Sequence, residues 1–279
     1  MTEIEKKIII GKLQEYCEHI GSQNKASKTI GVSVATVNQI LNGNLANISD
    51  EMFRKISAGI GYDGKEWNVV ETRGFKRITN ILNDVKSNSL VVAIKGEAGC
   101  GKTEAIKTFA KTTENVFNLS CSEYWNRKYF LAELLKTMGK DYSGTIGEMM
   151  SEVIDGLLHS DKAIIVLDEA DKLNDTVLYF FISLYNQLED HCGIVLCSTD
   201  YMEKRIKRGV RLNKRGYKEI YSRIGRKFVE IQNINASDIA AVCKANGVED
   251  SVKIKSIIEE SEGDLRRVKR RIHASKINA

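Results

Sequence analysis

A glycine-rich octapeptide at residues 96–103 restricts the fold more than any other feature of the chain. It reads Gly-Glu-Ala-Gly-Cys-Gly-Lys-Thr and fits the pattern G-x-x-x-x-G-K-[ST] at every fixed position. Glycines at these positions let backbone N–H groups turn inward around phosphate oxygens, where side chains at positive φ would obstruct them. A helix that starts directly behind the loop adds the positive end of its dipole. The motif therefore predicts a nucleotide-phosphate site between a strand and a helix.

The segments on either side of this loop supply that context. Residues 90–94 form a short apolar run that predicts a buried strand, and residues 103–112 have the pattern of a helix. The Lys102 ammonium is expected to reach the β- and γ-phosphates, and the Thr103 hydroxyl to ligate Mg²⁺. The residues expected to surround the phosphates are Gly96, Glu97, Ala98, Gly99, Cys100, Gly101, Lys102, Thr103 and Glu104. ATP with Mg²⁺ is the predicted cofactor pair.

A second motif, residues 164–171, is an apolar run followed by acids: Ile-Ile-Val-Leu-Asp-Glu-Ala-Asp. A buried strand that ends in carboxylates places them at the carboxyl edge of a parallel sheet, where ligands bind. Asp168 is expected to support the Mg²⁺ shell, and Glu169 to position or deprotonate the attacking water. A strand ending in solvated acids is common when it occurs alone, but downstream of a P-loop the pair indicates ATP hydrolysis.

The pattern between the two motifs and beyond them alternates between helices and strands. Helices are predicted over residues 73–87, 123–138, 146–158 and 175–189, and strands over residues 116–119, 163–167 and 193–197. Strands separated by helices imply a parallel sheet covered on both faces. Residues 236–279 predict three further helices. The expected class is α/β, with a P-loop core, a parallel sheet and a helical lid.

The first 60 residues predict four short helices and no strand, with glycines 59, 61 and 64 marking the boundary. Residues 23–43 resemble the helix-turn-helix of Cro- and lambda-repressor-like proteins, in which Thr36, Asn38 and Gln39 would face outward from the recognition helix. The module is electrically neutral, whereas a free-standing DNA reader is usually basic. DNA contact and a docking or assembly role therefore both remain open. The predicted domains are residues 1–65, 66–232 and 233–279.

A basic segment, defined here as residues 203–227, holds eleven Lys or Arg and two Glu, while the whole chain carries a net charge of +5. Such density points to a polyanionic partner, with a solvated face of a long helix or loop as the alternative. Its first four cations are expected in a loop that faces a central channel. The residues expected to contact duplex DNA are Lys204, Arg205, Lys207, Arg208, Arg211, Lys214 and Arg215.

Together with these motifs, three further positions resemble the AAA+ superfamily of ATPases. Thr199 stands where sensor 1 contacts the γ-phosphate or the water, and Arg266, within Gly-Asp-Leu-Arg-Arg, stands where sensor 2 touches the γ-phosphate. The segment 221–226 is similar to the arginine-finger box. The resemblance implies a finger at Arg223 or, as second choice, Arg226, acting on a neighbour's nucleotide in a homo-oligomer. Contact of both arginines with a phosphate backbone is the alternative.

The order of a repressor-like module, a short linker and a minimal AAA+ core resembles the family of Mu phage B transposition proteins, as do residues 70–75 and 101–105. That resemblance implies an ATP-loaded protein that binds duplex DNA with little sequence preference, assembles on it as a ring or helical filament, and activates a DDE transposase. The chain departs from the family after Arg271, where little room remains for an additional domain. Two rivals stay open: a replication initiator or helicase loader, and an ATP-switched transcriptional regulator.

The composition also sets limits on localisation and redox chemistry. No run approaches the roughly 18 apolar residues that span a bilayer, and acidic residues interrupt any secretory pattern in residues 1–20. We therefore expect a cytoplasmic protein, and the resemblance to the transposition proteins implies a bacterial host cell, or a protein encoded by a phage or mobile element. The six cysteines include no C-x-x-C pair and are expected to be reduced and mostly buried.

Overall fold

The chain divides into two units, and each is described by itself. The computed structural model describes residues 1, 3–45, 48–60, 62 and 67–277. Contacts between residues separate Met1–Asn68 from Val69–Ala279. The finer division at residues 65 and 232, predicted from the sequence, stays a prediction.

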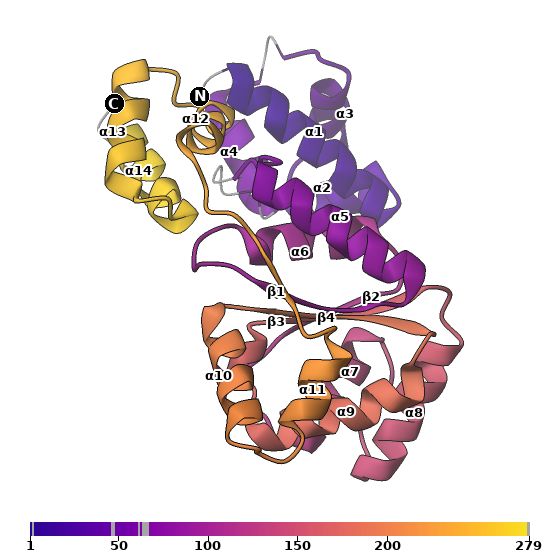
Figure 1. Ribbon diagram of the computed structural model, residues 1–279. Helices are drawn as coiled ribbons and strands as arrows, with labels where there is room; N and C mark the ends of the chain where they lie inside the picture. The colour runs from indigo at the N-terminus through magenta and orange to yellow at the C-terminus, as the bar shows by residue number, and fades with distance from the viewer. Residues whose placement is uncertain (2, 46–47, 61, 63–66, 278–279) are drawn as a thin grey trace. The chain divides into compact units, whose positions relative to one another are not determined.

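The smaller unit is built from the four predicted helices, α1 (Glu3–Ile20), α2 (Gln23–Ile30), α3 (Val34–Leu41) and α4 (Asp50–Gly59) (Figure 1). A serine begins each of the last three: Ser22, Ser33 and Ser49 accept a hydrogen bond from the backbone N–H three residues later. Gly31, with φ of 73°, makes the turn between α2 and α3. The small core includes Ile9, Leu13, Val37, Ile40 and Phe53. Of the predicted boundary glycines, two, at positions 61 and 64, lie outside the described residues.

The larger unit is centred on a parallel sheet whose strands follow the order β2-β3-β4-β1-β5. The strands are β1 (Val91–Lys95), β2 (Val116–Ser120), β3 (Ala163–Asp168), β4 (Cys192–Ser198) and β5 (Phe228–Glu230). Every residue of β3 and β4 is buried, because the central strands of a parallel sheet are covered on both faces. The sequence predicted the first four strands. It missed β5, which is only three residues long and lies at the edge.

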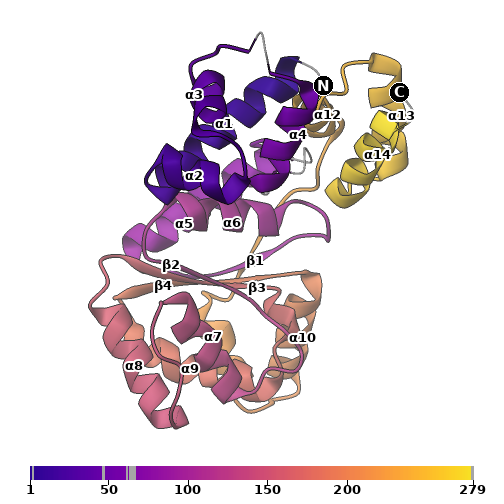
Figure 2. The ribbon, with the colours of Figure 1, turned by 180° about the vertical axis from the view of Figure 1, so that it is seen from behind.

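Helices cover both faces of this sheet. Figure 1 and the view from behind in Figure 2 place α5 and α6 on one face and α7 to α11 on the other. Their bounds are α5 (Arg73–Asn88), α6 (Lys102–Thr112), α7 (Arg127–Thr137), α8 (Ile146–Leu158), α9 (Asp175–Leu188), α10 (Asp200–Arg211) and α11 (Tyr217–Arg223). Among the described residues no helix combines the length and apolar character needed to cross a bilayer. All six cysteines are free and buried, as expected.

The sequence predicted a loop at the start of the basic segment. This prediction is wrong, because those residues lie on helix α10. Thr199 caps the start of this helix, and Met202 and Ile206 are buried on its apolar side. Ion pairs one turn apart, Lys204 with Asp200 and Lys207 with Glu203, support its exposed side. The periodicity was masked in the sequence by the density of charge.

The last part of the larger unit contains the three predicted helices, α12 (Ala236–Ala245), α13 (Ser251–Ser261) and α14 (Leu265–Ile277) (Figure 1). They pack on one another through buried residues such as Val242, Ile257 and Val268. Asp238, on α12, accepts a hydrogen bond from the backbone N–H of Arg73 at 3.3 Å. This bond ties helices α12 to α14, which are called the lid from here on, to the start of α5.

Candidate active site

The glycine-rich loop joins β1 to α6, which is the strand–loop–helix arrangement expected of it. Gly99 and Gly101 have φ of 80° and 94°, in the left-handed region that glycine adopts without strain. The N–H of Gly96 donates to the Ser198 carbonyl at 3.2 Å, so the loop starts beside the end of β4. The turn places the beginning of α6, with its partial positive charge, at the mouth of the loop.

The Lys102 side chain lies across this loop. Its Nζ donates to the carbonyl oxygens of Gly96 at 2.7 Å and Glu97 at 2.8 Å, and it lies 3.6 Å from Cys100 Sγ. Phosphate oxygens are stronger acceptors for an ammonium group than neutral carbonyls. Lys102 is therefore placed to exchange these bonds for contacts with a bound phosphate.

Thr103 and Asp168 meet where the two motifs come together. The Thr103 hydroxyl donates to Asp168 Oδ2 at 2.7 Å, and the Glu169 N–H donates to Oδ1 at 3.0 Å. Burial raises the pKa of the Asp168 carboxyl, although both hydrogen bonds oppose that shift. Hydroxyl and carboxylate oxygens suit Mg²⁺, which takes few protein ligands and completes its shell with phosphate and water. The pair fits a nucleotide-bound Mg²⁺, whose charge would favour the ionised carboxylate.

Glu169 lies just beyond the strand in an unusual conformation. Its φ of 56° is in the left-handed region, and its carboxylate forms an ion pair with Lys172 at 2.7 Å. Both side chains are about two-fifths exposed, so solvent screens the pair. The carboxylate is therefore free to exchange this contact for one with a water molecule in the site.

Thr199 follows the end of β4, beside the acidic motif. Its hydroxyl donates to Asp171 Oδ2 at 2.6 Å and accepts from the Tyr201 N–H at 3.4 Å. The neighbouring Ser198 hydroxyl is buried and donates to backbone carbonyls. Of the two, Thr199 is the half-exposed side chain at the site.

The lid meets the P-loop at the turn before α14, a contact that the sequence did not indicate. The Leu265 N–H donates to the Gly99 carbonyl at 3.0 Å. Asp264 lies so close that a Cβ on Gly99 would be 2.1 Å from its Oδ1. The Arg266 side chain is exposed next to this contact, and no partner for its guanidinium is found within the described ranges. The Gly-Asp-Leu-Arg-Arg motif marked the turn, but only the fold reveals its partner.

The two arginine-finger candidates differ in their surroundings. The Arg223 guanidinium lies 4.7 Å from the centre of the Tyr185 ring and donates to Asn186 Oδ1 at 2.9 Å. Its Nε is buried, and no described residue forms a hydrogen bond with it. Arg226 is exposed, and the part of the chain that is described contains no partner for it. Arg223 is thus held by contacts within its own chain, whereas the Arg226 side chain is exposed to solvent.

The candidate DNA contacts fall into two groups. Acidic residues of the same unit pair with four of the seven cations that were predicted to contact DNA from the basic segment: Lys204, Arg205, Lys207 and Lys214. Arg208, Arg211 and Arg215 are exposed and form no ion pair with another described residue. Their guanidinium groups are therefore accessible to an external anion.

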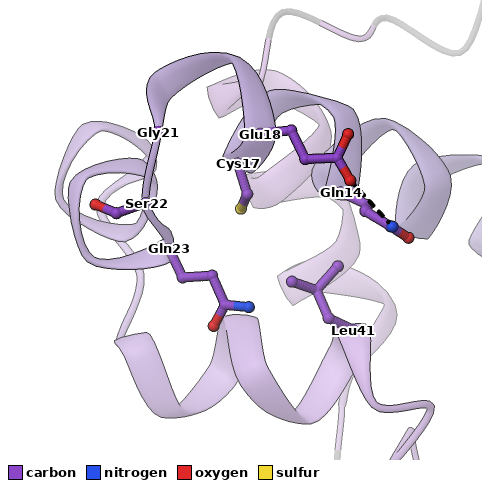
Figure 3. A pocket seen from close by; sticks show the side chains of 7 residues that line it. All are labelled: Gln14, Cys17, Glu18, Gly21, Ser22, Gln23 and Leu41. Carbon is purple, nitrogen blue, oxygen red and sulfur yellow. Dashed lines mark hydrogen bonds between the residues drawn. The ribbon is translucent and has the colours of Figure 1, made fainter.

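In the smaller unit, helix α3, which was predicted to be the recognition helix, presents Asn38 and Gln39 to solvent, while Thr36 is half-buried. The Thr36 hydroxyl lies 2.8 Å from the Ser33 hydroxyl at the helix start. A pocket of about 440 Å³ opens elsewhere on this unit, lined by Gln14, Cys17, Glu18, Gly21, Ser22, Gln23 and Leu41 (Figure 3). None of its lining residues is a predicted site residue.

Comparisons with known proteins agree with both units. Residues 85–206 match the family described as the AAA domain, and residues 14–67 match the family described as helix-turn-helix. The Mu-like prophage FluMu DNA transposition protein B of Haemophilus influenzae is 25% identical over 277 residues, which cover 92% of this chain and 93% of that protein. The ATP-dependent target DNA activator B of Escherichia phage Mu is 25% identical over 204 residues. That match covers 71% of this chain and 62% of the phage protein.

Among solved structures, Cdc6p from Pyrobaculum aerophilum aligns with a TM-score of 0.48 and 15% identity, covering 65% of this chain and 51% of that one. The AAA domain match and the ATP-dependent relatives confirm two expectations from the sequence. The chain has a nucleotide-binding AAA domain behind a helix-turn-helix domain, and it is an ATPase.

Proposed function

We propose that this ATPase binds duplex DNA in its ATP-bound state with little sequence preference, and that it assembles there as a homo-oligomer. The assembly, a ring or helical filament, would present the DNA as a target to a DDE transposase. The observation that carries the proposal is the similarity to the Haemophilus protein named for DNA transposition, which extends over 92% of this chain and so includes both domains. The phage relatives are named as ATP-dependent activators of target DNA. The site of action would be the cytoplasm of a bacterial host.

The active-site geometry supports a division of roles. Lys102 would bind the phosphates, Thr103 and Asp168 would hold Mg²⁺, and Glu169 would orient the attacking water. Bound Mg²⁺ would neutralise charge on the transferred phosphoryl group. In a homo-oligomer we assign the arginine finger to Arg226 rather than Arg223, because Arg226 is the exposed candidate.

Imaging of protein–DNA mixtures by negative-stain electron microscopy tests the proposal. The Glu169→Gln variant, which should retain ATP, is mixed with unrelated duplexes in ATP, ADP or no nucleotide. Filaments or rings on every duplex, in ATP alone, are the expected result. Discrete complexes on one sequence would instead favour a replication initiator or a transcriptional regulator, and assemblies that ignore the nucleotide would contradict the proposal.

Three exposed arginines of the basic segment, Arg208, Arg211 and Arg215, lead to a prediction about salt dependence. Replacing Arg208, Arg211 and Arg215 with alanine should weaken DNA binding and reduce the slope of log affinity against log salt by about 2.7, at roughly 0.9 per lost phosphate contact. Fluorescence anisotropy with labelled duplexes at several salt concentrations measures this slope. Alanine at Lys244, Lys253 and Lys255, three exposed cations of the lid, removes equal charge and should leave it unchanged. Equal effects of the two triple variants would refute this assignment.

A further inference from the structure

Arg205 is oriented differently from the other cations of helix α10. Lys204, Lys207, Arg208 and Arg211 recur at three- and four-residue spacing and share the exposed side of the helix. Arg205 lies beside the buried Met202 and Ile206, and its side chain is 16% exposed against 74% for Lys204. Its charge therefore acts within the protein.

The Arg205 guanidinium holds the segment that follows the catalytic Glu169. Its Nη1 donates to the carbonyl oxygens of Leu173 at 2.6 Å and Asp171 at 3.4 Å. Its Nη2 donates to Asp175 Oδ1 at 2.5 Å. Those two carbonyls lie at the end of the short 3-10 helix η1 (Ala170–Lys172), which the guanidinium thereby caps. This geometry uses the planar fork of an arginine, which a lysine cannot reproduce.

Asp175 is the anion against which Arg205 is fixed. It also accepts hydrogen bonds from the Tyr217 hydroxyl at 2.8 Å and from Lys214 Nζ at 3.0 Å. Burial raises the pKa of its carboxyl, but the bonds from Arg205, Tyr217 and Lys214 outweigh burial and lower it to about 2. The carboxylate is thus ionised at neutral pH and anchors Arg205 beside η1.

Asp171 belongs to η1, and its carboxylate determines how the Thr199 hydroxyl can act. A hydroxyl has one proton to donate, and that of Thr199 is directed to Asp171 Oδ2 at 2.6 Å. Among the described residues its oxygen accepts a single long hydrogen bond, from the Tyr201 N–H at 3.4 Å, so it can accept another. A water molecule can donate to this oxygen, whereas an ionised phosphate oxygen has no proton to give.

We propose that Asp171 and Arg205 are positioning residues for ATP hydrolysis. Arg205 fixes the segment 171–175 by donating to the carbonyl oxygens of Asp171 and Leu173. Asp171 orients the Thr199 hydroxyl so that its oxygen can accept a hydrogen bond from the attacking water. Thr199 acts on the water rather than on the γ-phosphate. Since a displacement of about 1 Å can cost roughly 100-fold in rate, loss of either positioning contact is expected to slow the chemical step.

A double-mutant cycle tests the part played by Asp171. Asp171→Ala and Thr199→Val should each lower kcat by roughly 10- to 100-fold, with KM for ATP within about threefold of the wild type. The double variant should be no slower than the slower single variant, because both changes remove one device. Asp171→Asn, whose amide oxygen still accepts the Thr199 proton, should recover part of the rate. Multiplying effects in the double variant, or a rise in KM at unchanged kcat, would overturn the proposal.

A separate comparison distinguishes positioning by Arg205 from DNA contact. Arg205→Lys keeps the charge but not the fork, and should lower kcat roughly tenfold or more without DNA, while the salt slope of DNA binding is retained. Arg77→Lys, at an exposed position on α5, is the matched control. Thermal unfolding of each variant verifies that it is folded. Thr199→Ser, which keeps the hydroxyl that bonds to Asp171, gives a milder change at the same contact. Normal DNA-free hydrolysis with a reduced salt slope in Arg205→Lys would assign Arg205 to DNA instead.

Discussion

Replacing Glu169 with glutamine should lower the rate constant for ATP hydrolysis by roughly 100- to 1000-fold while ATP still binds, because the step loses a general base or water-orienting carboxylate. The side chain lies beside Asp168 but accepts no hydrogen bond from the P-loop, and within the described residues its ion pair is with Lys172. Its removal therefore leaves the phosphate-binding loop intact. Single-turnover hydrolysis and the affinity for a fluorescent ATP analogue measure the two effects separately.

The control for this variant is Glu114→Gln, an exposed glutamate in the turn before β2. It makes the same chemical change away from the site and should hydrolyse ATP at the normal rate. If Glu169→Gln lost ATP affinity as well as rate, the carboxylate would have a structural role in the loop. A normal rate would remove Glu169 from the mechanism.

The second large effect is expected from Gly99→Ala, which should detach the lid from the P-loop and lower ATP affinity by about tenfold or more. An alanine there meets two obstacles: a φ of 80°, which costs an L-residue about 1–2 kcal/mol, and a Cβ only 2.1 Å from Asp264 Oδ1. Overpacking of this kind typically adds about 1–3 kcal/mol. Together they exceed the roughly 1.4 kcal/mol that corresponds to a tenfold change in affinity.

Two further variants separate the effect of backbone strain at Gly99 from the effect of the steric clash with Asp264. Gly139→Ala has a similar φ, 68°, with no atom within 4 Å of the added Cβ, so it reports backbone strain alone. Adding Asp264→Ala to Gly99→Ala removes the clash and should restore part of the ATP affinity. Isothermal titration calorimetry measures ATP binding, and limited proteolysis at the lid reports its attachment. Unchanged ATP affinity in Gly99→Ala would show that the contact between lid and P-loop does not support nucleotide binding.

Much of the fold could be predicted because its signals are local. The P-loop glycines, the apolar run before Asp168 and the serine caps of the amino-terminal helices each act within a few residues of themselves. Helix α10 escaped prediction because five cations among its twelve residues obscure its apolar side, and β5 because three edge residues carry too little periodicity. The predicted domain boundary at residue 65 lies outside the described residues, and contacts between residues divide the chain at Asn68 and Val69 instead.

The candidate site also combines residues that local motifs predict with contacts that depend on the fold. Lys102, Thr103, Asp168 and Glu169 follow from motifs in which backbone geometry fixes the chemistry, and the structure brings Thr103 and Asp168 within 2.7 Å. Whether a given arginine serves DNA, a neighbour or its own subunit cannot be read from charge alone. That depends on which side of its helix is buried and on which acids lie opposite.

The sequence by itself determined a nucleotide-binding α/β core and a helix-turn-helix domain, and it predicted the groups at the phosphates, since each rests on residues adjacent in the chain. Only the tertiary structure decided that Arg205 faces η1, that Thr199 gives its proton to Asp171, and that Gly99 contacts the lid. These are contacts between elements far apart in sequence. Their partners are selected by the packing of helices on the sheet, a property of the whole unit that no short segment encodes.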